Sequence, residues 1–231
     1  MTPTSNSRDI IERLKQWGAC DVADGLSKLK HPDGGFLEGL TLYSPDYQAG
    51  ETKIVGQAFT VKFVPKDDQA APRLGGNYVR DVSWASKLTA LTWLIVFYEV
   101  NAVYGGLMTL RAQAVGAAGV VIDGRVRDLG EHRALKFPLF ARYAGTTAGG
   151  AVCRPSEVNV PVRLHSEHQE AWINPGDYIV ADLNGVVRVP RETVEEVLDV
   201  IPEIVEADRK CAEGIRAGRS VQDVFKEFRG R

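Results

Sequence analysis

Cysteine and histidine are scarce in this chain, and neither is arranged as in a disulfide-rich or zinc-binding protein. Among 231 residues there are three cysteines, Cys20, Cys153 and Cys211, with no CxxC spacing. The four histidines form no HExxH pattern. A sparse and odd set of cysteines argues against a disulfide framework and a structural zinc site, and it is typical of a reducing compartment. We therefore expect a cytoplasmic protein.

Long apolar segments and an excess of charge are also missing. The apolar run at residues 94–98 is far too short to cross a bilayer, and residues 1–8 are polar and lack the apolar core of a secretory signal. The net charge of −2 gives no basic field that would attract nucleic acid. These absences predict that neither membranes nor nucleic acids are partners.

What remains is the composition of an ordinary globular protein. With 44% apolar and 25% charged residues, the chain can bury a sizeable core. Its length suits one large domain, or one domain with appendages. Strand patterns alternate with helix patterns in the middle of the chain, while the later part is richer in strands. We therefore predict the α/β class with a mixed sheet.

Apolar periodicity and glycine turns predict the individual elements. Strands are expected over residues 54–64, 94–98, 119–122, 138–141, 158–164, 178–182 and 186–189. Helices are expected over residues 10–17, 21–29, 107–115 and 129–135.

The C-terminal segment is predicted to be helical. We expect residues 1–190 to form the α/β domain, and residues 191–231 to form an extension that packs on the same domain or on a neighbouring subunit. Thr193 and Glu196 have the spacing of a capping box for a helix that starts near residue 194. Pro202 should kink or restart this helix, and Ser220 can cap a last helix.

The most informative stretch is VVIDGRVRD at residues 120–128. A run of β-branched residues leads to an arginine and a carboxylate, side by side, where the chain leaves the strand. Arg127 could grip a carboxylate, and Asp128 could hold a hard metal ion. Such a pair suits chemistry on small oxo-acids.

Simpler interpretations of the same residues stay open. Asp128 and Glu131 have the spacing of an N-cap pair for the helix at residues 129–135. Arg127 could form a surface ion pair with no ligand. Asp123, which precedes a glycine, is interpreted as a turn former.

A second candidate is the turn at Gly105 and Gly106, between a strand and a helix. Free N–H groups and the positive end of the helix would suit a carboxylate or a phosphate. The pattern is neither GxGxxG nor a P-loop, so it does not predict a nucleotide site. A glycine pair can also serve packing alone. Because both candidates follow strands, they could converge in one crevice.

Together these segments resemble the RraA-like family, which includes the regulator of ribonuclease E activity and the class II 4-hydroxy-4-methyl-2-oxoglutarate/4-carboxy-4-hydroxy-2-oxoadipate aldolases. The resemblance is carried by NAVYGGLM at residues 101–108 and GAAGVVIDGRVRD at residues 116–128. Further matching segments lie at residues 21–26, 56–61, 137–140, 175–182 and 185–190. The resemblance covers most of residues 10–218.

The resemblance implies a fold, an assembly and a set of site residues. The fold is a swivelling β/β/α domain, assembled as a homotrimer or as a homohexamer of two trimers. Relatives with aldolase activity use a divalent metal, Mg²⁺ or Mn²⁺; Asp128 matches the metal ligand, and Arg127 matches the residue that grips the oxo-acid. The N–H groups that match those binding the substrate's carboxylate belong to Gly105, Gly106, Leu107 and Met108.

The implied activity is that of a metal-dependent lyase on short 2-oxo-acids. Aldol cleavage and oxaloacetate decarboxylation both pass through a pyruvate enolate, and neither needs a Schiff-base lysine. The alternative is a non-catalytic regulator that binds a ribonuclease. Compact regulators lack the extension after Pro190, so its presence favours the enzyme.

The chain also departs from the pattern of the aldolase relatives. They usually carry Asp or Glu at the position of Gly106, and a lysine in a segment where Arg154 is the nearest cation here. Aldol cleavage needs a base for the hydroxyl proton and decarboxylation does not, so Gly106 favours oxaloacetate decarboxylation. In relatives an acidic residue of the C-terminal helix reaches a neighbouring subunit's site. The candidates for that role here are Glu203, Glu206 and Asp208.

Overall fold

The computed structural model describes residues 5–74, 91–96 and 100–230, and it confirms the α/β class with a mixed sheet. The large sheet contains β1 (Phe36–Leu37), β2 (Thr41–Ser44), β3 (Ile54–Pro65), β4 (Leu91–Val96), β5 (Ala102–Tyr104), β6 (Gly119–Val126), β7 (Leu139–Ala144), β8 (Cys153–Val158), β11 (Tyr178–Asp182) and β12 (Gly185–Val189). Its order is β1-β12-β11-β3-β4-β6-β7-β2, with β5 beside β6 and β8 beside β3. A separate antiparallel pair is formed by β9 (Val162–Arg163) and β10 (Trp172–Ile173).

Parallel strands form the centre of the sheet. β3, β4, β6 and β7 are parallel neighbours, and β5 runs parallel beside β6. Parallel strands are covered on both faces, which explains why the β-branched run of β6 is fully buried. The carboxyl ends of neighbouring parallel strands meet at one edge of the sheet. Tyr104 at the end of β5 lies opposite Val126 at the end of β6, so the residues that follow them emerge together.

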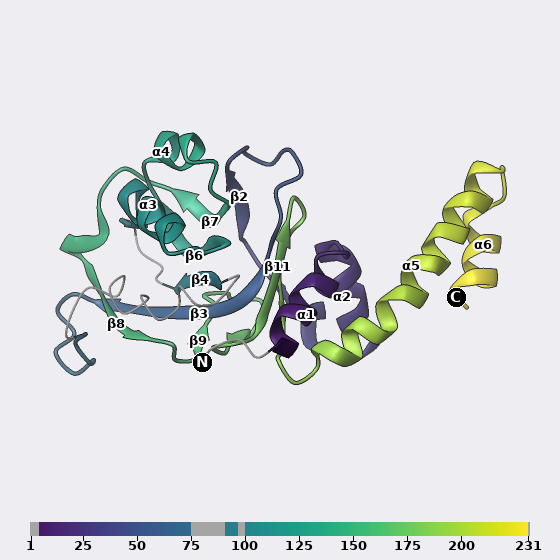
Figure 1. The fold of residues 1–231 in the computed structure, drawn as a ribbon, viewed down its shortest axis with the longest axis horizontal. Coiled ribbons are helices and arrows are strands. Elements are labelled where there is room, and N and C mark those ends of the chain that lie inside the picture. Colours follow the sequence, from purple (N-terminus) through teal and green to yellow (C-terminus); the bar gives the residue numbers. More distant parts are fainter. Residues whose placement is uncertain (1–4, 75–90, 97–99, 231) are drawn as a thin grey trace.

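Helices cover the sheet in two groups (Figure 1). The helices are α1 (Ser5–Leu14), α2 (Ala19–Lys28), α3 (Gly106–Ala114), α4 (Leu129–Ala134), α5 (Val194–Arg216) and α6 (Val221–Phe228), with short 3-10 helices at Pro32–Gly35 and Gly149–Ala151. α3 and α4 lie beside β6 and β7, whereas α1, α2 and the start of α5 pack beyond β11. Buried apolar side chains fill both interfaces, including Ala112 and Val126 in the first and Leu26 and Ile201 in the second.

The C-terminal helices differ in detail from the prediction. α5 is one helix of 23 residues that continues through Pro202, so the predicted restart is wrong. A proline removes one hydrogen bond from a helix, but the neighbouring Val197, Leu198 and Ile201 are buried against α2, and this packing offsets the loss. The outer part of α5 and the returning α6 project from the body of the molecule (Figure 1).

The two predicted helix caps have opposite outcomes. The capping box at Thr193 is not formed: its backbone has φ −106° and ψ −3°, not the extended conformation of an N-cap, and its hydroxyl donates to the Pro190 carbonyl. The Ser220 cap of α6 is confirmed, because Ser220 Oγ accepts a hydrogen bond from the Asp223 N–H at 3.1 Å.

Two predicted strands also differ in extent. The strand expected over residues 158–164 is wrong: β8 ends at Val158 and β9 begins at Val162. Asn159 has φ 55°, a left-handed conformation that interrupts an extended chain. The strand expected at residues 94–98 corresponds to β4, and its residues 97–98 lie outside the described part of the chain.

Asp123 does not form a turn, and its prediction as a turn former is wrong. It lies within β6, fully buried, at an irregularity in the pairing with β7 between Ile122 and Arg125. Its carboxylate forms an ion pair with Arg142 of β7 and accepts a hydrogen bond from the His165 N–H at 2.5 Å. Burial raises the pKa of Asp123, although these partners act in the opposite direction. Asp123 therefore joins β6, β7 and the segment after β9.

Candidate active site

The ends of β5 and β6 bring the two sequence candidates together. The Arg127 N–H donates to the Tyr104 carbonyl at 3.0 Å, so the segments that follow β5 and β6 stay paired just beyond the strands. Gly105 therefore packs directly against Arg127 and Asp128. A Cβ atom added to Gly105 would lie 2.6 Å from Asp128 Oδ2 and 3.3 Å from Arg127 Nε. Gly105 is needed here because any side chain would displace the carboxylate.

Asp128 has an unusual backbone conformation that directs its side chain away from its own helix. Its φ of 62° and ψ of 40° are left-handed, a region that aspartate enters more readily than most residues. It stands at the N-cap of α4, but its side chain makes no hydrogen bond to that helix, so the interpretation as an N-cap pair with Glu131 is wrong. Instead, Oδ2 accepts the Gly106 N–H at 3.1 Å, at the first residue of α3. Asp128 therefore caps the neighbouring helix.

Arg127 lies beside this carboxylate and is open to solvent. Its Nε is 3.4 Å from Asp128 Oδ2, and the side chains of Arg127 and Asp128 are 40% and 31% exposed. An ion pair with this exposure contributes little stability. Among the described residues, nothing accepts a hydrogen bond from the two terminal guanidinium nitrogens. They are therefore available to a carboxylate ligand.

The start of α3 offers fewer N–H groups than the sequence predicted. The Gly106 N–H is taken by Asp128, and the Met108 N–H donates to the Gly105 carbonyl at 3.0 Å. Within the described chain, the Leu107 N–H finds no acceptor. An anion at this helix start would therefore meet the Leu107 N–H and the positive end of the α3 dipole.

The Glu131 side chain also reaches the start of α3. The sequence had suggested only that Glu131 helps to cap its own helix, α4. A Cβ atom added to Gly106 would lie 1.8 Å from Glu131 Oε2. The Glu131 side chain therefore lies over the α-carbon of Gly106. Sequence spacing could not show this, because the contact joins two different helices.

His132 is buried behind the site and holds the Arg127 backbone in place. The sequence patterns did not identify it as a site residue. It is fully buried, and its Nε2 lies 2.6 Å from the Arg127 carbonyl oxygen. Since a carbonyl can only accept, Nε2 carries the proton, and Nδ1 of the neutral ring accepts from Thr109 Oγ1 of α3 at 2.8 Å. Burial is the main cause that lowers the pKa of His132, which favours this neutral form. The sequence signal that could have identified His132 is its spacing, four residues after Asp128 in a short predicted helix.

The donor set decides which metal ions would suit the site. No group of three or more His, Cys, Asp or Glu side chains able to hold a metal occurs in the described part of the chain. Mg²⁺ and Mn²⁺ do not need such a cage, because waters can complete the shell around one or two carboxylates. Asp128 Oδ1 has no hydrogen-bond partner among the described residues. Asp128 therefore fits a hydrated divalent ion.

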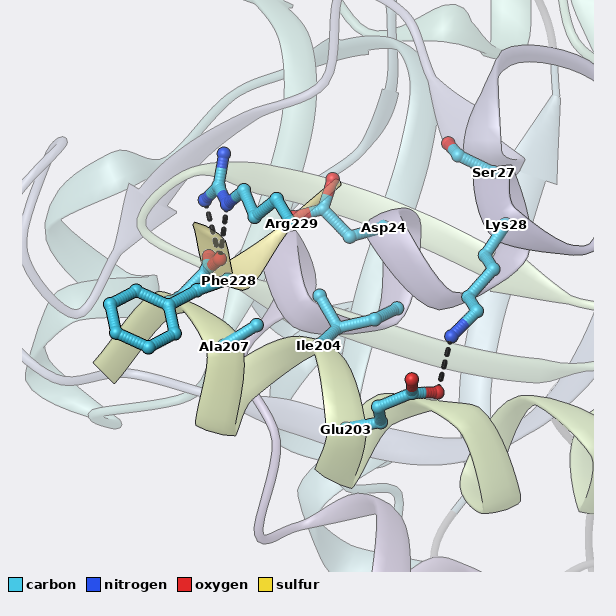
Figure 2. Close-up of a pocket in the computed structure, with 9 residues that line it drawn as sticks. Asp24, Ser27, Lys28, Glu203, Ile204, Ala207, Phe228 and Arg229 are labelled. Carbon is cyan, nitrogen blue, oxygen red and sulfur yellow. Dashed lines mark hydrogen bonds and ion pairs between the residues drawn. The ribbon is translucent and has the colours of Figure 1, made fainter. Parts of the chain in front are cut away.

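The acidic candidates of α5 are paired within their own chain. Glu203 Oε2 lies 2.5 Å from Lys28 Nζ, and Asp208 Oδ1 lies 2.6 Å from Arg229 Nε. Glu206 is 2.7 Å from Arg209 Nε. Glu203 and Asp208 line a cavity of about 360 Å³ between α2, α5 and α6 (Figure 2). These helices lie away from α3 and α4 (Figure 1), so the structure does not bring the three residues to their own chain's Arg127.

Arg154 is occupied elsewhere. Its guanidinium donates to the carbonyls of Asp68, Ala71 and Pro72, at 2.7, 3.0 and 2.7 Å. Its two terminal nitrogens therefore hold the loop after β3, while its Nε is buried without a hydrogen-bond partner among the described residues, so the charged end of Arg154 is fixed at that loop.

A model of the RraA-like family, described as Aldolase/RraA, matches residues 19–188. The chain belongs to the RraA-like family. The matched range contains both strand ends of the candidate site, and the resemblance inferred from the sequence is confirmed. No helix in the described ranges is long and apolar enough to span a membrane.

Individual relatives differ in what their names say. An uncharacterized protein of Methanocaldococcus jannaschii is 36% identical over 174 residues, which is 74% of this chain and 77% of that protein. A protein of Halalkalibacterium halodurans named "Putative 4-hydroxy-4-methyl-2-oxoglutarate aldolase" is 34% identical over 124 residues, and the match spans 53% of each chain. The chain thus aligns with about half the length of that named aldolase.

Solved structures confirm the fold. A Streptomyces coelicolor protein, described as an unusual member of the RNase ES inhibitor RraA protein family, has a TM-score of 0.71. The match covers 90% of this chain and 96% of that one, at 22% identity. At this identity the likeness establishes the RraA-like α/β fold with its C-terminal helix, and no more.

Proposed function

We propose that this protein is a divalent-metal-dependent lyase that acts on short 2-oxo-acids through a pyruvate enolate. The observation that carries the proposal is the contact between Asp128 and the start of α3, with Arg127 beside it. A carboxylate with one unengaged oxygen, an exposed guanidinium and a helix N-terminus meet at one place. The family, which includes proteins named as aldolases, supports the same reaction class.

Each residue has a role that follows from its chemistry. Asp128 would hold Mg²⁺ or Mn²⁺ together with waters, and the bound ion would supply a Lewis acid for the 2-oxo group. The planar fork of Arg127 binds a substrate carboxylate and places positive charge where the enolate oxygen develops. The Leu107 N–H and the α3 dipole favour the same anion.

Aldol cleavage of 4-hydroxy-4-methyl-2-oxoglutarate and decarboxylation of oxaloacetate would both be possible at such a site. In each reaction the bond between C3 and C4 breaks and its electron pair enters the enolate. The two reactions differ in one requirement, because aldol cleavage must also remove the proton of the 4-hydroxyl group. Proton handling therefore decides the balance between them.

We further propose a homotrimer or a homohexamer of two trimers. The outer part of α5 and α6 projects from the body, where another copy could contact it (Figure 1). Glu203, Glu206 and Asp208 would then be candidates for a neighbouring subunit's site, at the expense of their pairs within the chain.

A coupled assay for pyruvate tests the proposal. Protein treated with EDTA should release no pyruvate from oxaloacetate or from 4-hydroxy-4-methyl-2-oxoglutarate, and added Mg²⁺ or Mn²⁺ should restore the release. A fully active Asp128→Ala variant would overturn the proposal.

The alternative role, a non-catalytic regulator, makes a different prediction. Chain length does not separate the two roles, because the Streptomyces protein covers 90% of this chain. A stoichiometric complex with a ribonuclease, combined with no metal-dependent turnover of either substrate, would support the regulator.

A further inference from the structure

The Glu131 side chain takes the place that a side chain at position 106 would fill. A Cβ atom on Gly106 would lie 1.8 Å from Glu131 Oε2, 2.6 Å from its Cδ and 2.7 Å from its Cβ. Distances this short mean that the whole side chain, and not only its tip, covers the Gly106 α-carbon. Gly106 therefore makes room for a carboxylate that arrives from α4.

Two carboxylates consequently cover consecutive residues at the start of α3. Asp128 Oδ2 lies against Gly105 and Glu131 Oε2 against Gly106. The positive end of the α3 dipole favours negative charge at both positions. Glu131 belongs to the same cluster as the proposed metal ligand and Arg127, and it reaches that cluster from one turn further along α4.

The two carboxylates differ in their hydrogen-bond and ion-pair partners. Asp128 Oδ2 accepts the Gly106 N–H and lies near Arg127. Among the residues that the structure describes, none donates a hydrogen bond or forms an ion pair with the Glu131 carboxylate. Glu131 is also exposed. A carboxylate that is exposed, unneutralised and adjacent to a substrate site can accept a proton from the substrate.

A structural role for Glu131 does not explain this position. Glu131 is the third residue of α4, where a glutamate could complete a capping box with the N-cap residue. The side chain of Asp128 makes no cap bond to α4, and the Glu131 carboxylate lies over α3 instead.

We propose that Glu131 is the catalytic base for aldol cleavage in this chain. The inference rests on the proposed lyase function and changes one expectation from the sequence. Gly106 does not leave the site without a second carboxylate, so its presence does not by itself favour decarboxylation.

The proton and electron balance is complete without any additional reactant. Glu131 takes the proton of the substrate's 4-hydroxyl group, and the electron pair of that O–H bond forms the carbonyl of the departing oxo-acid. The bond between C3 and C4 breaks, its pair forms the double bond between C2 and C3, and the π pair of the C2 carbonyl moves onto the enolate oxygen, from which it returns when C3 is protonated. Glu131 then returns the proton to C3, which yields pyruvate and restores the ionised carboxylate.

The test compares two reactions in one set of variants. In Glu131→Gln, kcat for cleavage of 4-hydroxy-4-methyl-2-oxoglutarate should fall about 100-fold relative to kcat for oxaloacetate decarboxylation, since a general base contributes roughly 10²–10⁴-fold. A general loss of structure would reduce both reactions together. The matched control is Glu51→Gln, which changes an exposed glutamate outside the site and should leave both rates unchanged.

A second set of variants moves the carboxylate to the other helix. Gly106→Asp alone should be impaired, because its side chain would collide with Glu131. Adding Glu131→Gly to Gly106→Asp removes the whole Glu131 side chain, including the Cβ atom that would lie 2.7 Å from the new one, and supplies a carboxylate from α3. Aldol cleavage should therefore recover at least about tenfold over Glu131→Gly alone, as part of the contribution of a general base.

The outcomes separate the two proposals. If the wild type shows no metal-dependent pyruvate release from either substrate, the lyase function fails. If the wild type is active but Glu131→Gln keeps its ratio of aldol cleavage to decarboxylation, or if the wild type only decarboxylates, the role of Glu131 is overturned and the lyase function stands.

Discussion

The Asp128 carboxylate accepts a hydrogen bond from the Gly106 N–H at 3.1 Å, across 22 residues of sequence. This bond fastens the residue that follows β6 to the helix that follows β5. It uses Oδ2 for structure and leaves Oδ1 without a partner among the described residues. The carboxylate that caps α3 is also the metal ligand of the proposed function, so the observed role and the proposed one can be separated by substitution.

Asp128→Asn should separate them. The asparagine amide oxygen can still accept the Gly106 N–H, but its charge is lost, so the variant should fold with little change in the free energy of unfolding and show no metal-dependent pyruvate release. Asp128→Ala should lose the cap as well, at a cost of about 1 kcal/mol. Urea denaturation and the pyruvate assay measure the two effects. An active Asp128→Asn variant would contradict a role in metal binding.

Gly105→Ala should damage the site through a steric clash. The new Cβ atom would lie 2.6 Å from Asp128 Oδ2 and 3.3 Å from Arg127 Nε, so either the Gly105 backbone or these side chains must move. We expect a loss of about 1–3 kcal/mol in the free energy of unfolding, typical of overpacking, together with loss of activity. The matched control is Gly130→Ala in α4, where a Cβ atom meets nothing within 4 Å. That variant should be neutral, or more stable by up to about 1 kcal/mol.

Arg127→Lys should weaken substrate binding without affecting the fold. Lysine keeps the charge but loses the planar fork, so KM for the oxo-acid should rise about tenfold, the equivalent of roughly 1.4 kcal/mol. The Arg127–Asp128 ion pair is exposed, so the free energy of unfolding should change by less than about 1 kcal/mol. Arg111→Lys, at an exposed position on α3, serves as the control. Equal KM values for both variants would exclude Arg127 as the carboxylate clamp.

His132→Phe should disturb the support beneath Arg127. The phenyl ring can keep the contact with Tyr104, whose ring centroid lies 5.9 Å from that of His132. It leaves the Arg127 carbonyl without its His132 partner, at a cost of about 1–3 kcal/mol for an unsatisfied buried group, while the Thr109 hydroxyl keeps its hydrogen bond with the Tyr104 hydroxyl at 3.2 Å. Thermal and urea unfolding should both report the loss. An unchanged stability would mean that water replaces the ring nitrogens.

The central sheet and the meeting of its strand ends could be predicted from sequence, for physical reasons. β-branched runs mark buried parallel strands and glycines mark turns, so β6 and the turn at Gly105 follow from local signals, whereas the short strand β5 that leads to Gly105 was not predicted. Family resemblance added the proposed role of Asp128 as a metal ligand. These signals depend on residues that are close together in the sequence.

Other features depend on contacts between distant segments, which local patterns do not contain. Asp123 before Gly124 has the sequence of a turn, but its ion pair with Arg142 holds it inside β6. Asp128 and Glu131 have the spacing of a capping pair for α4, but Asp128 has a left-handed backbone conformation and its side chain makes no hydrogen bond to that helix. The position of Glu131 over Gly106 requires the packing of α4 against α3.

Asp123→Asn should be the most destabilising of these substitutions. The Arg142 side chain is 9% exposed and Asp123 is fully buried, so the variant leaves a guanidinium in the protein interior without its negative partner. Removing one member of a buried ion pair typically costs about 3–5 kcal/mol. The Lys62–Glu157 pair is a matched control because its side chains are 46% and 29% exposed, and Glu157→Gln should cost less than about 1 kcal/mol. Urea denaturation of both variants gives the comparison, and similar losses in the two would show that the Asp123–Arg142 pair is not what holds β6 to β7.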